Sequence, residues 1–319
     1  MSATADIFIY LLVLTPILLI IGCPIGTSIC VGSVLSMGAI LGMNATLVSA
    51  TRIYSGMNSF ALIAIPFFVL AGVIMNTGGI AQKLINLAKV FIGFIPGALA
   101  HTNTVANMMF GAISGSGVAA AAAIGSVMLP IEKKEGYEPR LSAAVNIASA
   151  PSGMIIPPSN IFIIYSLASG GVSVAALFVA GYLPGILWGL AVIIVTAFYA
   201  WKLKYKAQPI SGWGTRLQIF IEAIPAILLI IIIIGGIISG WFTPTEASCV
   251  AVVYSAILSG FYRSFHWKDV PAMLLSTAKT TALIVFLIGV SAILGWVLAY
   301  AKIPNMIATA LINFADTPS

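Results

Sequence analysis

The sequence predicts an all-α polytopic membrane protein that contains a re-entrant helical hairpin and a broken helix. Of its 319 residues, 61% are hydrophobic and 7% are charged, whereas soluble domains carry about 25% charged residues. Two runs rich in small residues, 111–117 and 150–160, interrupt apolar sequence that is otherwise typical of spanning helices. An internal similarity between 61–88 and 282–311 indicates a repeat.

The net charge of +6 does not indicate a nucleic-acid-binding protein. The basic residues lie in short clusters between apolar segments, as orientation signals do, and they do not build a broad basic face that would neutralise phosphates. Cys23, Cys30 and Cys249 lie in or beside apolar segments, with neither a Cys-x-x-Cys pair nor a nearby histidine. The sequence therefore predicts no redox, disulfide or transition-metal role for them.

The number of crossings follows from the length of a spanning helix. Such a helix needs about 20 mostly apolar residues. The segments expected to cross on this basis are 7–22, 25–43, 59–77, 141–168 (broken), 173–201, 217–240, 246–262 and 280–300.

Two short apolar arms, about 97–112 and 117–131, meet at Ser114–Gly117. Each arm is too short to cross comfortably at about 1.5 Å per residue. Basic residues flank the pair on both sides, and cytoplasmic loops collect such residues. The sequence therefore predicts a hairpin over 97–131 that enters from the cytoplasm. The flanking basic residues are Lys83, Lys89, Lys133, Lys134 and Arg140.

The same rule orients the remaining spans and places the N-terminus outside. With alternate crossings, the cytoplasmic side receives Lys202, Lys204, Lys206, Arg216, Arg263 and Lys268. Only Arg52 and Lys302 are expected outside.

The repeat predicts an inverted architecture. Ala61–Ile63, an apolar span and an amphipathic segment over 80–88 match Ala282–Ile284, a span and a segment over 303–311. By the expected topology the two copies run in opposite directions, as in many secondary transporters. The second repeat is truncated, because no hairpin or broken helix follows it. The expected divisions are 1–58 (scaffold spans), 59–172 (core of repeat one), 173–279 (scaffold spans) and 280–319 (start of repeat two).

Non-helical chain at membrane depth is tolerated only where it is buried in protein or lines a cavity, so the two interruptions predict a binding site. Carbonyls without helical donors, together with hydroxyl neighbours, suit a cation, and half-helix N-termini suit an anion. The residues expected to bind sodium are Ser114, Gly115, Ser116, Gly117, Ser149, Pro151, Ser152 and Gly153. Those expected to contact substrate are Asn103, Ser116, Pro157, Pro158, Ser159 and Asn160.

Each of these features has a structural alternative. The small residues at 114–117 also suit close helix packing, and the prolines could be kinks alone. His101 and Asn103 are more often satisfied polar residues than ligands. For Glu246 the preferred interpretation is structural: Thr243–Glu246 is typical of a helix N-cap and first turn.

Two other functional classes remain open. An intramembrane serine hydrolase would need a nucleophile beside a histidine, and the available pair is Ser114 or Ser116 with His101. Those residues share one arm about three turns apart, which disfavours the hydrolase. A non-catalytic scaffold or channel subunit would differ from a transporter by uptake that does not saturate.

Three motifs resemble the large membrane subunit of tripartite ATP-independent periplasmic (TRAP) transporters. These are Phe110-Gly-Ala-Ile-Ser-Gly-Ser-Gly-Val-Ala-Ala, Ile156-Pro-Pro-Ser and Gly240-Trp-Phe-Thr-Pro-Thr-Glu-Ala-Ser. The resemblance implies an elevator-type, sodium-coupled importer in the bacterial inner membrane. It also implies a small four-helix membrane subunit and a periplasmic binding protein as partners.

The chain departs from the family pattern in two places. The second hairpin and its broken helix do not follow Leu311, so we expect an N-terminal part of a longer permease that cannot transport alone. Asn160 stands where an aliphatic residue is usual. With the run 142–153, it resembles the branch that imports sialic acid (N-acetylneuraminate), a carboxylate substrate.

Overall fold

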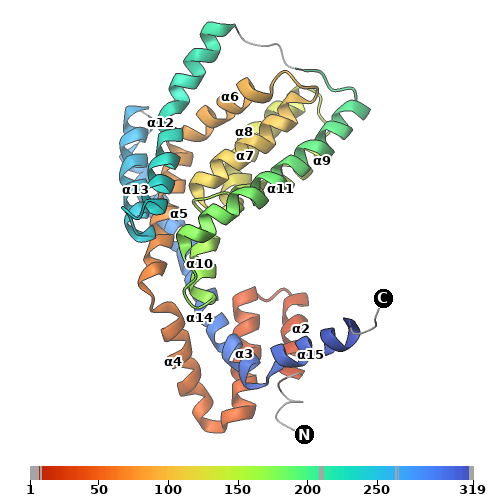
Figure 1. Ribbon diagram of the computed structural model, residues 1–319, viewed down its shortest axis with the longest axis vertical. Coiled ribbons are helices and arrows are strands. Elements are labelled where there is room, and N and C mark those ends of the chain that lie inside the picture. The colour runs from red at the N-terminus through yellow and green to blue at the C-terminus, as the bar shows by residue number, and fades with distance from the viewer. Residues whose placement is uncertain (1–6, 8, 208–211, 263, 265, 316–319) are drawn as a thin grey trace. The chain divides into compact units, whose positions relative to one another are not determined.

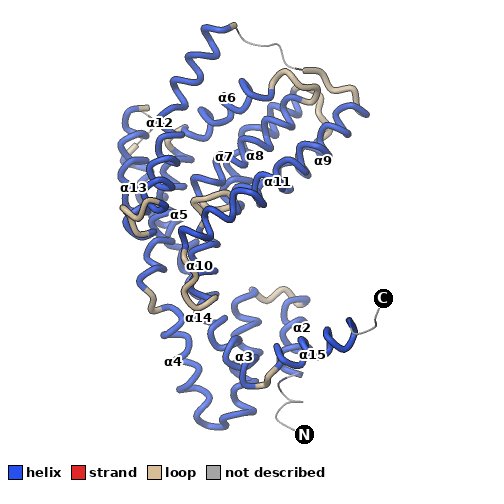
Figure 2. The backbone as a smooth tube through the Cα atoms, in the orientation of Figure 1, coloured by secondary structure: helices blue, strands red, loops and turns tan. Residues whose placement is uncertain are grey.

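The computed structural model describes residue 7 and residues 9–207, 212–262, 264 and 266–315. The regular structure of these residues is helical throughout, without a strand (Figures 1 and 2). Six helical segments are long and apolar enough to cross a membrane, and a seventh is the bent pair Pro139–Ile155 and Asn160–Ala168. The expected all-α polytopic fold class is confirmed.

The chain divides into two compact units, each described here by itself. The terminal unit comprises Met1–Ser59 and Thr280–Ser319, and the central unit comprises Phe60–Lys279. The divisions after Ser59 and after Lys279 fall within one residue of the boundaries expected after residues 58 and 279. The functional labels of scaffold and core stay predictions, as does the inversion of the repeat.

The first expected span, 7–22, is shorter in the structure. A π-helix (Ile9–Leu14) and α2 (Thr15–Ile20) contain six residues each. At about 1.5 Å per residue they extend about 18 Å, against a hydrocarbon core of about 30 Å. Gly22, with φ +97°, lies in the turn that follows. The prediction of a full span here is wrong for the described residues.

The second expected span continues into a helical hairpin. After α3 (Ile25–Leu41), Gly42 has φ +58° and a short 3-10 turn (Gly42–Asn44) leads into α4 (Ala45–Met57). The chain reverses there, and as a result Ser49 Oγ on α4 lies 3.2 Å from Met37 Sδ on α3. The end expected near 43 agrees with the end of α3 at Leu41, and the polar residues of α4 form a further helix that was not expected from the sequence. Thr51, for example, donates its hydroxyl to the Leu47 carbonyl.

The central unit carries the hairpin and the broken helix. Its helices are a 3-10 turn (Phe60–Ile63), α5 (Ala64–Thr77), α6 (Ile80–Ile92), α7 (Ala98–Ser114), α8 (Gly117–Lys134), α9 (Pro139–Ile155), α10 (Asn160–Ala168), α11 (Val174–Lys202), α12 (Trp213–Ile238) and α13 (Pro244–Phe261). A 3-10 turn (Trp267–Asp269) precedes α14 (Val270–Tyr300), which starts ten residues before the expected span and runs on across the division at Lys279. The Thr277 hydroxyl donates to the Met273 carbonyl one turn earlier. This polar side chain is therefore satisfied within the helix. The last helix is α15 (Ile303–Ala315).

The core of the central unit forms around α7. This helix packs on α6, α8, α9 and α11, while α5 packs along α13 (Figure 1). Phe68, Phe110 and Phe178 are among its largest fully buried side chains. Amphipathic α6 buries Ile80, Leu84 and Ile85 as the sequence predicts. The central unit thereby holds the hairpin in contact with the broken helix.

Two loops meet at one end of the central unit. The Tyr137 and Tyr205 rings stack with centroids 4.2 Å apart, and the Glu138 N–H donates to the Tyr205 hydroxyl at 2.9 Å. Burial raises the pKa of the Tyr137 hydroxyl, so this group stays neutral while it accepts from the Leu99 N–H. The loop 132–140 and the tract 202–206 therefore lie at the same end, as expected. Residues 208–211 of the tract and Arg263 lie outside the described residues.

Candidate functional site

The hairpin turns within four residues. α7 ends at Ser114, and Gly115 takes the left-handed conformation (φ +61°) with its N–H donating to the Gly111 carbonyl at 2.8 Å. Ser116 is extended and caps α8, since its hydroxyl accepts from the Ala119 N–H at 3.3 Å. Glycine at 115 permits the positive φ, and serine at 116 supplies the N-cap. The predicted tip at 114–117 is confirmed.

The broken helix is interrupted over 156–159. Its halves, α9 and α10, are bent by 56°. Pro157 and Pro158 lie in the break and are buried, and proline offers no N–H to a helix. Pro151 lies inside α9, which continues to Ile155, so the break is shorter than the run 150–160 that the sequence suggested. One proline within a helix removes a single backbone bond, and the neighbouring bonds hold that helix together.

The hairpin tip lies against the break. A Cβ built on Gly115 would lie 3.1 Å from both the backbone N and the Nδ2 of Asn160. A turn nearer the hairpin base, a Cβ on Gly153 would lie 2.5 Å from the Gly111 Cα and from the Asn107 carbonyl oxygen. Glycine at these positions permits backbone contact between hairpin and broken helix. Of the predicted residues, the structure therefore brings together 114–117, Ser159 and Asn160.

Polar atoms without partners lie at this meeting point. Ser159 and Asn160 are 1% and 5% exposed, and neither Ser159 Oγ nor Asn160 Oδ1 has a hydrogen-bond partner among the described residues. The Ser114 hydroxyl makes only long bonds, donating to the Ser116 carbonyl at 3.3 Å. Buried polar atoms normally have partners, so such atoms gathered in one place are typical of a ligand site.

Helix ends converge there with both polarities. α7 and α9 end at the tip and the break, and their last carbonyls lack intrahelical donors. α8 and α10 begin there, and their first N–H groups lack intrahelical acceptors. The carbonyl ends can hold a cation and the N–H ends an anion.

Other predicted residues lie within α9. Ser149 accepts from Asn107 Nδ2 at 2.9 Å, and the Ser152 hydroxyl donates to the Ser149 carbonyl at 2.5 Å. Gly153 lies in the backbone contact with α7. In this structure Ser149 and Gly153 join α9 to α7, and their role at a sodium site stays a prediction.

Asn103 lies away from the tip. It is eleven residues before Ser114 on α7, about 16 Å at 1.5 Å per residue. Its Nδ2 donates to Glu132 Oε1 at 3.1 Å, and its Oδ1 accepts from Asn107 Nδ2 at 2.9 Å. Asn103 is therefore a satisfied polar residue, the alternative stated for it, and its predicted contact with substrate has no support from its position.

A buried network extends from Asn103 and was missed by sequence reasoning. Asn107 Nδ2 also donates to Asn146 Oδ1 at 3.0 Å, and Asn146 Nδ2 donates to the Ala121 carbonyl at 2.9 Å. These amides and Glu132 are at most 5% exposed. The network ties α7, α8 and α9 together. Asparagines at positions 103 and 107, one turn apart in an apolar arm, were the signal that could have revealed it.

The remaining candidates are structural or isolated. Thr243 and Glu246 form a capping box, with the Thr243 N–H donating to Glu246 Oε2 at 2.8 Å, so the structural interpretation of Glu246 is confirmed. His101 is fully buried, and its ring nitrogens make no hydrogen bond of normal geometry among the described residues, although the Pro96 backbone lies close enough to interact with the ring. It stands thirteen residues before Ser114 on α7, about 20 Å, beyond reach of a serine nucleophile. The described residues contain no group of three or more His, Cys, Asp or Glu side chains that could hold a metal ion.

Comparison with known proteins identifies relatives along most of the chain. Residues 11–319 match the family of the DctM component of tripartite ATP-independent periplasmic transporters. An uncharacterized Salmonella typhimurium protein, YgiK, is 49% identical over 301 residues, which cover 94% of this chain and 69% of that protein. From Vibrio cholerae, the C4-dicarboxylate TRAP transporter large permease protein DctM is 36% identical (93% of this chain, 70% of that protein).

A second Vibrio cholerae relative is the sialic acid TRAP transporter large permease protein SiaM, which is 32% identical. The aligned region covers 94% of this chain and 70% of SiaM. The family match over residues 11–319 includes the hairpin, the break and the capping box. The chain therefore belongs to the TRAP transporter large permease (DctM) family and is a multi-pass membrane transporter subunit rather than an enzyme.

Proposed function

We propose that this chain mediates sodium-coupled secondary import of a small carboxylate through the site at the hairpin tip and the helix break. The observation that supports the proposal is the meeting of 114–117 with Ser159 and Asn160, where buried oxygen atoms lack partners. A periplasmic binding protein would deliver the substrate, and a small four-helix membrane subunit would complete the complex in the bacterial inner membrane.

Sodium would bind on the carbonyl side of the site. The last carbonyls of α7 and α9 and the hydroxyls of Ser114 and Ser116 offer hard oxygen ligands, and the tip carries no carboxylate. Helix C-termini favour cations through the helix dipole. Sodium binding would fix the tip against the break, and the substrate carboxylate would then meet the first N–H groups of α8 and α10.

Transport would move the hairpin and the broken helix together. The Gly111–Gly153 contact and the network of Asn103, Asn107 and Asn146 join α7, α8 and α9 into one packed body. A body held together in this way can carry a bound ion and substrate without internal rearrangement. This is the element that an elevator mechanism requires.

The substrate class rests on the relatives and on the local sequence. The named relatives transport C4-dicarboxylates, sialic acid and, for an Escherichia coli protein 34% identical to this chain, 2,3-diketo-L-gulonate. These compounds share a carboxylate group. Among them, the residues 142–153 and Asn160 favour N-acetylneuraminate.

Uptake into proteoliposomes that hold the full permease containing this chain, together with its partner subunit and binding protein, tests the proposal. Saturable uptake of one of the three substrates is expected under an inward Na⁺ gradient. No uptake is expected when choline replaces Na⁺. Ser116→Ala should raise the Na⁺ concentration for half-maximal uptake severalfold. The control Ser126→Ala removes an exposed hydroxyl that bonds within α8 and should transport normally. Equal uptake in choline would refute sodium coupling, and uptake that never saturates would favour a channel or scaffold role.

A further inference from the structure

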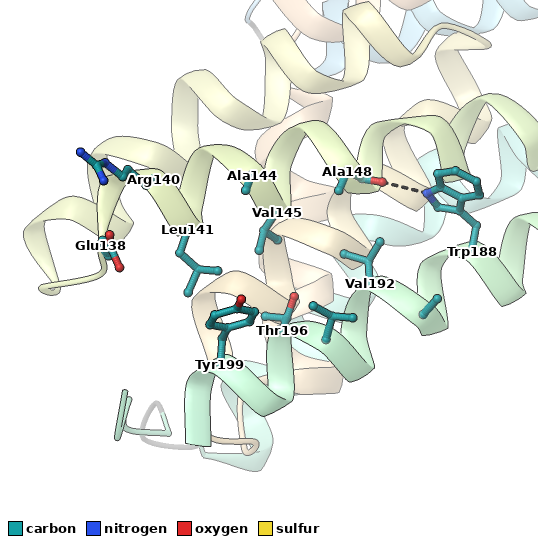
Figure 3. A pocket seen from close by; sticks show the side chains of 12 residues that line it. Glu138, Arg140, Leu141, Ala144, Val145, Ala148, Trp188, Val192, Thr196 and Tyr199 are labelled. Atoms are coloured by element: carbon teal, nitrogen blue, oxygen red, sulfur yellow. Dashed lines mark hydrogen bonds between the residues drawn. The ribbon is translucent and has the colours of Figure 1, made fainter. Parts of the chain in front are cut away.

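A groove unrelated to the hairpin tip lies between α9 and α11 (Figure 3). It encloses about 590 Å³. Its walls are apolar side chains from both helices: Leu141, Ala144, Val145 and Ala148 from α9, and Ala191, Val192 and Val195 from α11. Several of them are exposed, Val195 to 56%. In a membrane-spanning protein such a surface is covered by acyl chains or by another helix.

The two ends of the groove differ in chemistry. Glu138 and Arg140 lie at one end, where α9 begins, and both are exposed (Figure 3). Trp188 lies at the other end, where its indole N–H donates to the Ala148 carbonyl at 2.8 Å. The backbone N–H of Glu138 is held by the Tyr205 hydroxyl, so the charged end is anchored at the loop contact described above. The groove is thus charged at one end and closed by an aromatic ring at the other.

The length of the groove matches one leaflet of a bilayer. Arg140 and Ala148 are eight residues apart on α9, and Trp188 and Tyr199 are eleven apart on α11. At 1.5 Å per residue these distances are about 12 and about 16 Å. Half of the hydrocarbon core is about 15 Å. A chain that entered at Arg140 would therefore end near the bilayer centre.

The charged end of the groove favours a lipid as its occupant. Glu138 and Arg140 place one anion and one cation beside an apolar surface. A zwitterionic headgroup above an acyl chain has the matching arrangement of charge and apolar surface.

We infer that this groove binds a phospholipid whose headgroup carries both a phosphate and a primary ammonium, as phosphatidylethanolamine does. The Arg140 guanidinium pairs with the phosphate, and the Glu138 carboxylate accepts from the ammonium. One acyl chain lies along Ala144, Ala148 and Val192. A choline headgroup has no N–H to donate, and a glycerol headgroup has no cation, so neither would give Glu138 a charge-assisted hydrogen bond.

Native mass spectrometry of the delipidated full chain in detergent tests this inference, with dioleoyl lipids that bear ethanolamine, choline or glycerol headgroups as probes. Tightest binding is expected for the ethanolamine lipid. Arg140→Gln should weaken its binding about fivefold. Lys134→Gln, in the last turn of α8 and outside the groove, should not. Glu138→Gln should remove the preference for ethanolamine over choline.

A second pair of variants tests the apolar part. Ala144→Trp fills the groove and should abolish tight binding, whereas Ile147→Trp places the same indole at an α9 position that is 66% exposed outside the groove and should not. Unchanged lipid binding in Ala144→Trp overturns the acyl-chain site. Equal binding of the three headgroups overturns the headgroup assignment. Loss of the small subunit from Ala144→Trp, with lipid binding intact, would show that a partner helix occupies the groove instead.

Discussion

At the scale of single residues, glycines decide how closely the hairpin approaches the broken helix. Gly111 and Gly153 place two backbones in contact, and a Cβ on Gly153 would lie 2.5 Å from backbone atoms of α7. Backbone cannot yield as a flexible side chain can. The candidate site therefore depends on residues that contribute no polar side chain.

Gly153→Ala is expected to destabilise the protein by about 1–3 kcal/mol, the usual cost of overpacking. Thermal unfolding of the full chain in detergent measures the change. Gly235→Ala, in α12 with nothing near its Cβ position, is the matched control and should be neutral or slightly stabilising. An equal loss in both variants would contradict the role given to the Gly111–Gly153 contact.

The capping box gives a second residue-scale prediction. Thr243→Ala removes the N-cap of α13 and should cost about 1 kcal/mol of stability. Glu246→Gln keeps an acceptor for the Thr243 N–H and should retain both stability and transport. Loss of transport in a stably folded Glu246→Gln protein would assign Glu246 a functional charge.

At the scale of elements, two loops hold the ends of four helices together. Stacking of Tyr137 on Tyr205 joins the α8–α9 loop to the chain that follows α11. The Leu99 N–H adds the start of α7 to the same contact. Both hairpin ends and the end of α11 therefore lie together, and we expect them to face one side of the membrane.

Cysteine labelling tests this placement. Glu135→Cys and Lys206→Cys, each in a background without the native cysteines, should resist a membrane-impermeant maleimide added from the periplasmic side. Both should react once the membrane is opened. These positions avoid Gly136, whose φ of +82° disfavours a substituted side chain. Reaction of only one of them from outside would contradict their common side.

At the scale of the whole molecule, the two units have cores of very different size. The central unit buries a large apolar cluster around Phe68 and Phe110, whereas the terminal unit buries a small one around Met37 and Ile293. Between membrane helices, van der Waals packing and interhelical hydrogen bonds supply the stability, and the larger cluster contains more of this packing. Local opening should therefore be easier in the terminal unit.

Hydrogen exchange of the full chain in detergent micelles measures this difference. Amides of α3 and α4 should exchange through openings of lower free energy than those of α7 and α9. Added denaturant should expose the terminal unit first. Equal protection of all four helices would mean that the units unfold as one.

The features that depend on composition and local chemistry were predictable from the order of the residues. The low charge content predicted a polytopic helical protein, and the Ser-Gly-Ser-Gly tip follows from one left-handed glycine and one N-capping serine. Thr243–Glu246 was likewise predictable, because a capping box is made by residues three apart. Such interactions close within one turn, so their residues are read directly from the chain.

Which distant residues meet depends on how the helices pack. Asn160 lies at Gly115, Asn103 binds Glu132 away from the tip, and Pro151 sits within an unbroken helix. The groove between α9 and α11 likewise brings Glu138 and Arg140 into line with Trp188. In an apolar helix many faces look alike in sequence, because the hydrophobic pattern does not mark which side packs on a neighbour and which faces lipid. Packing of the small residues selects the face, and that selection depends on several helices at once.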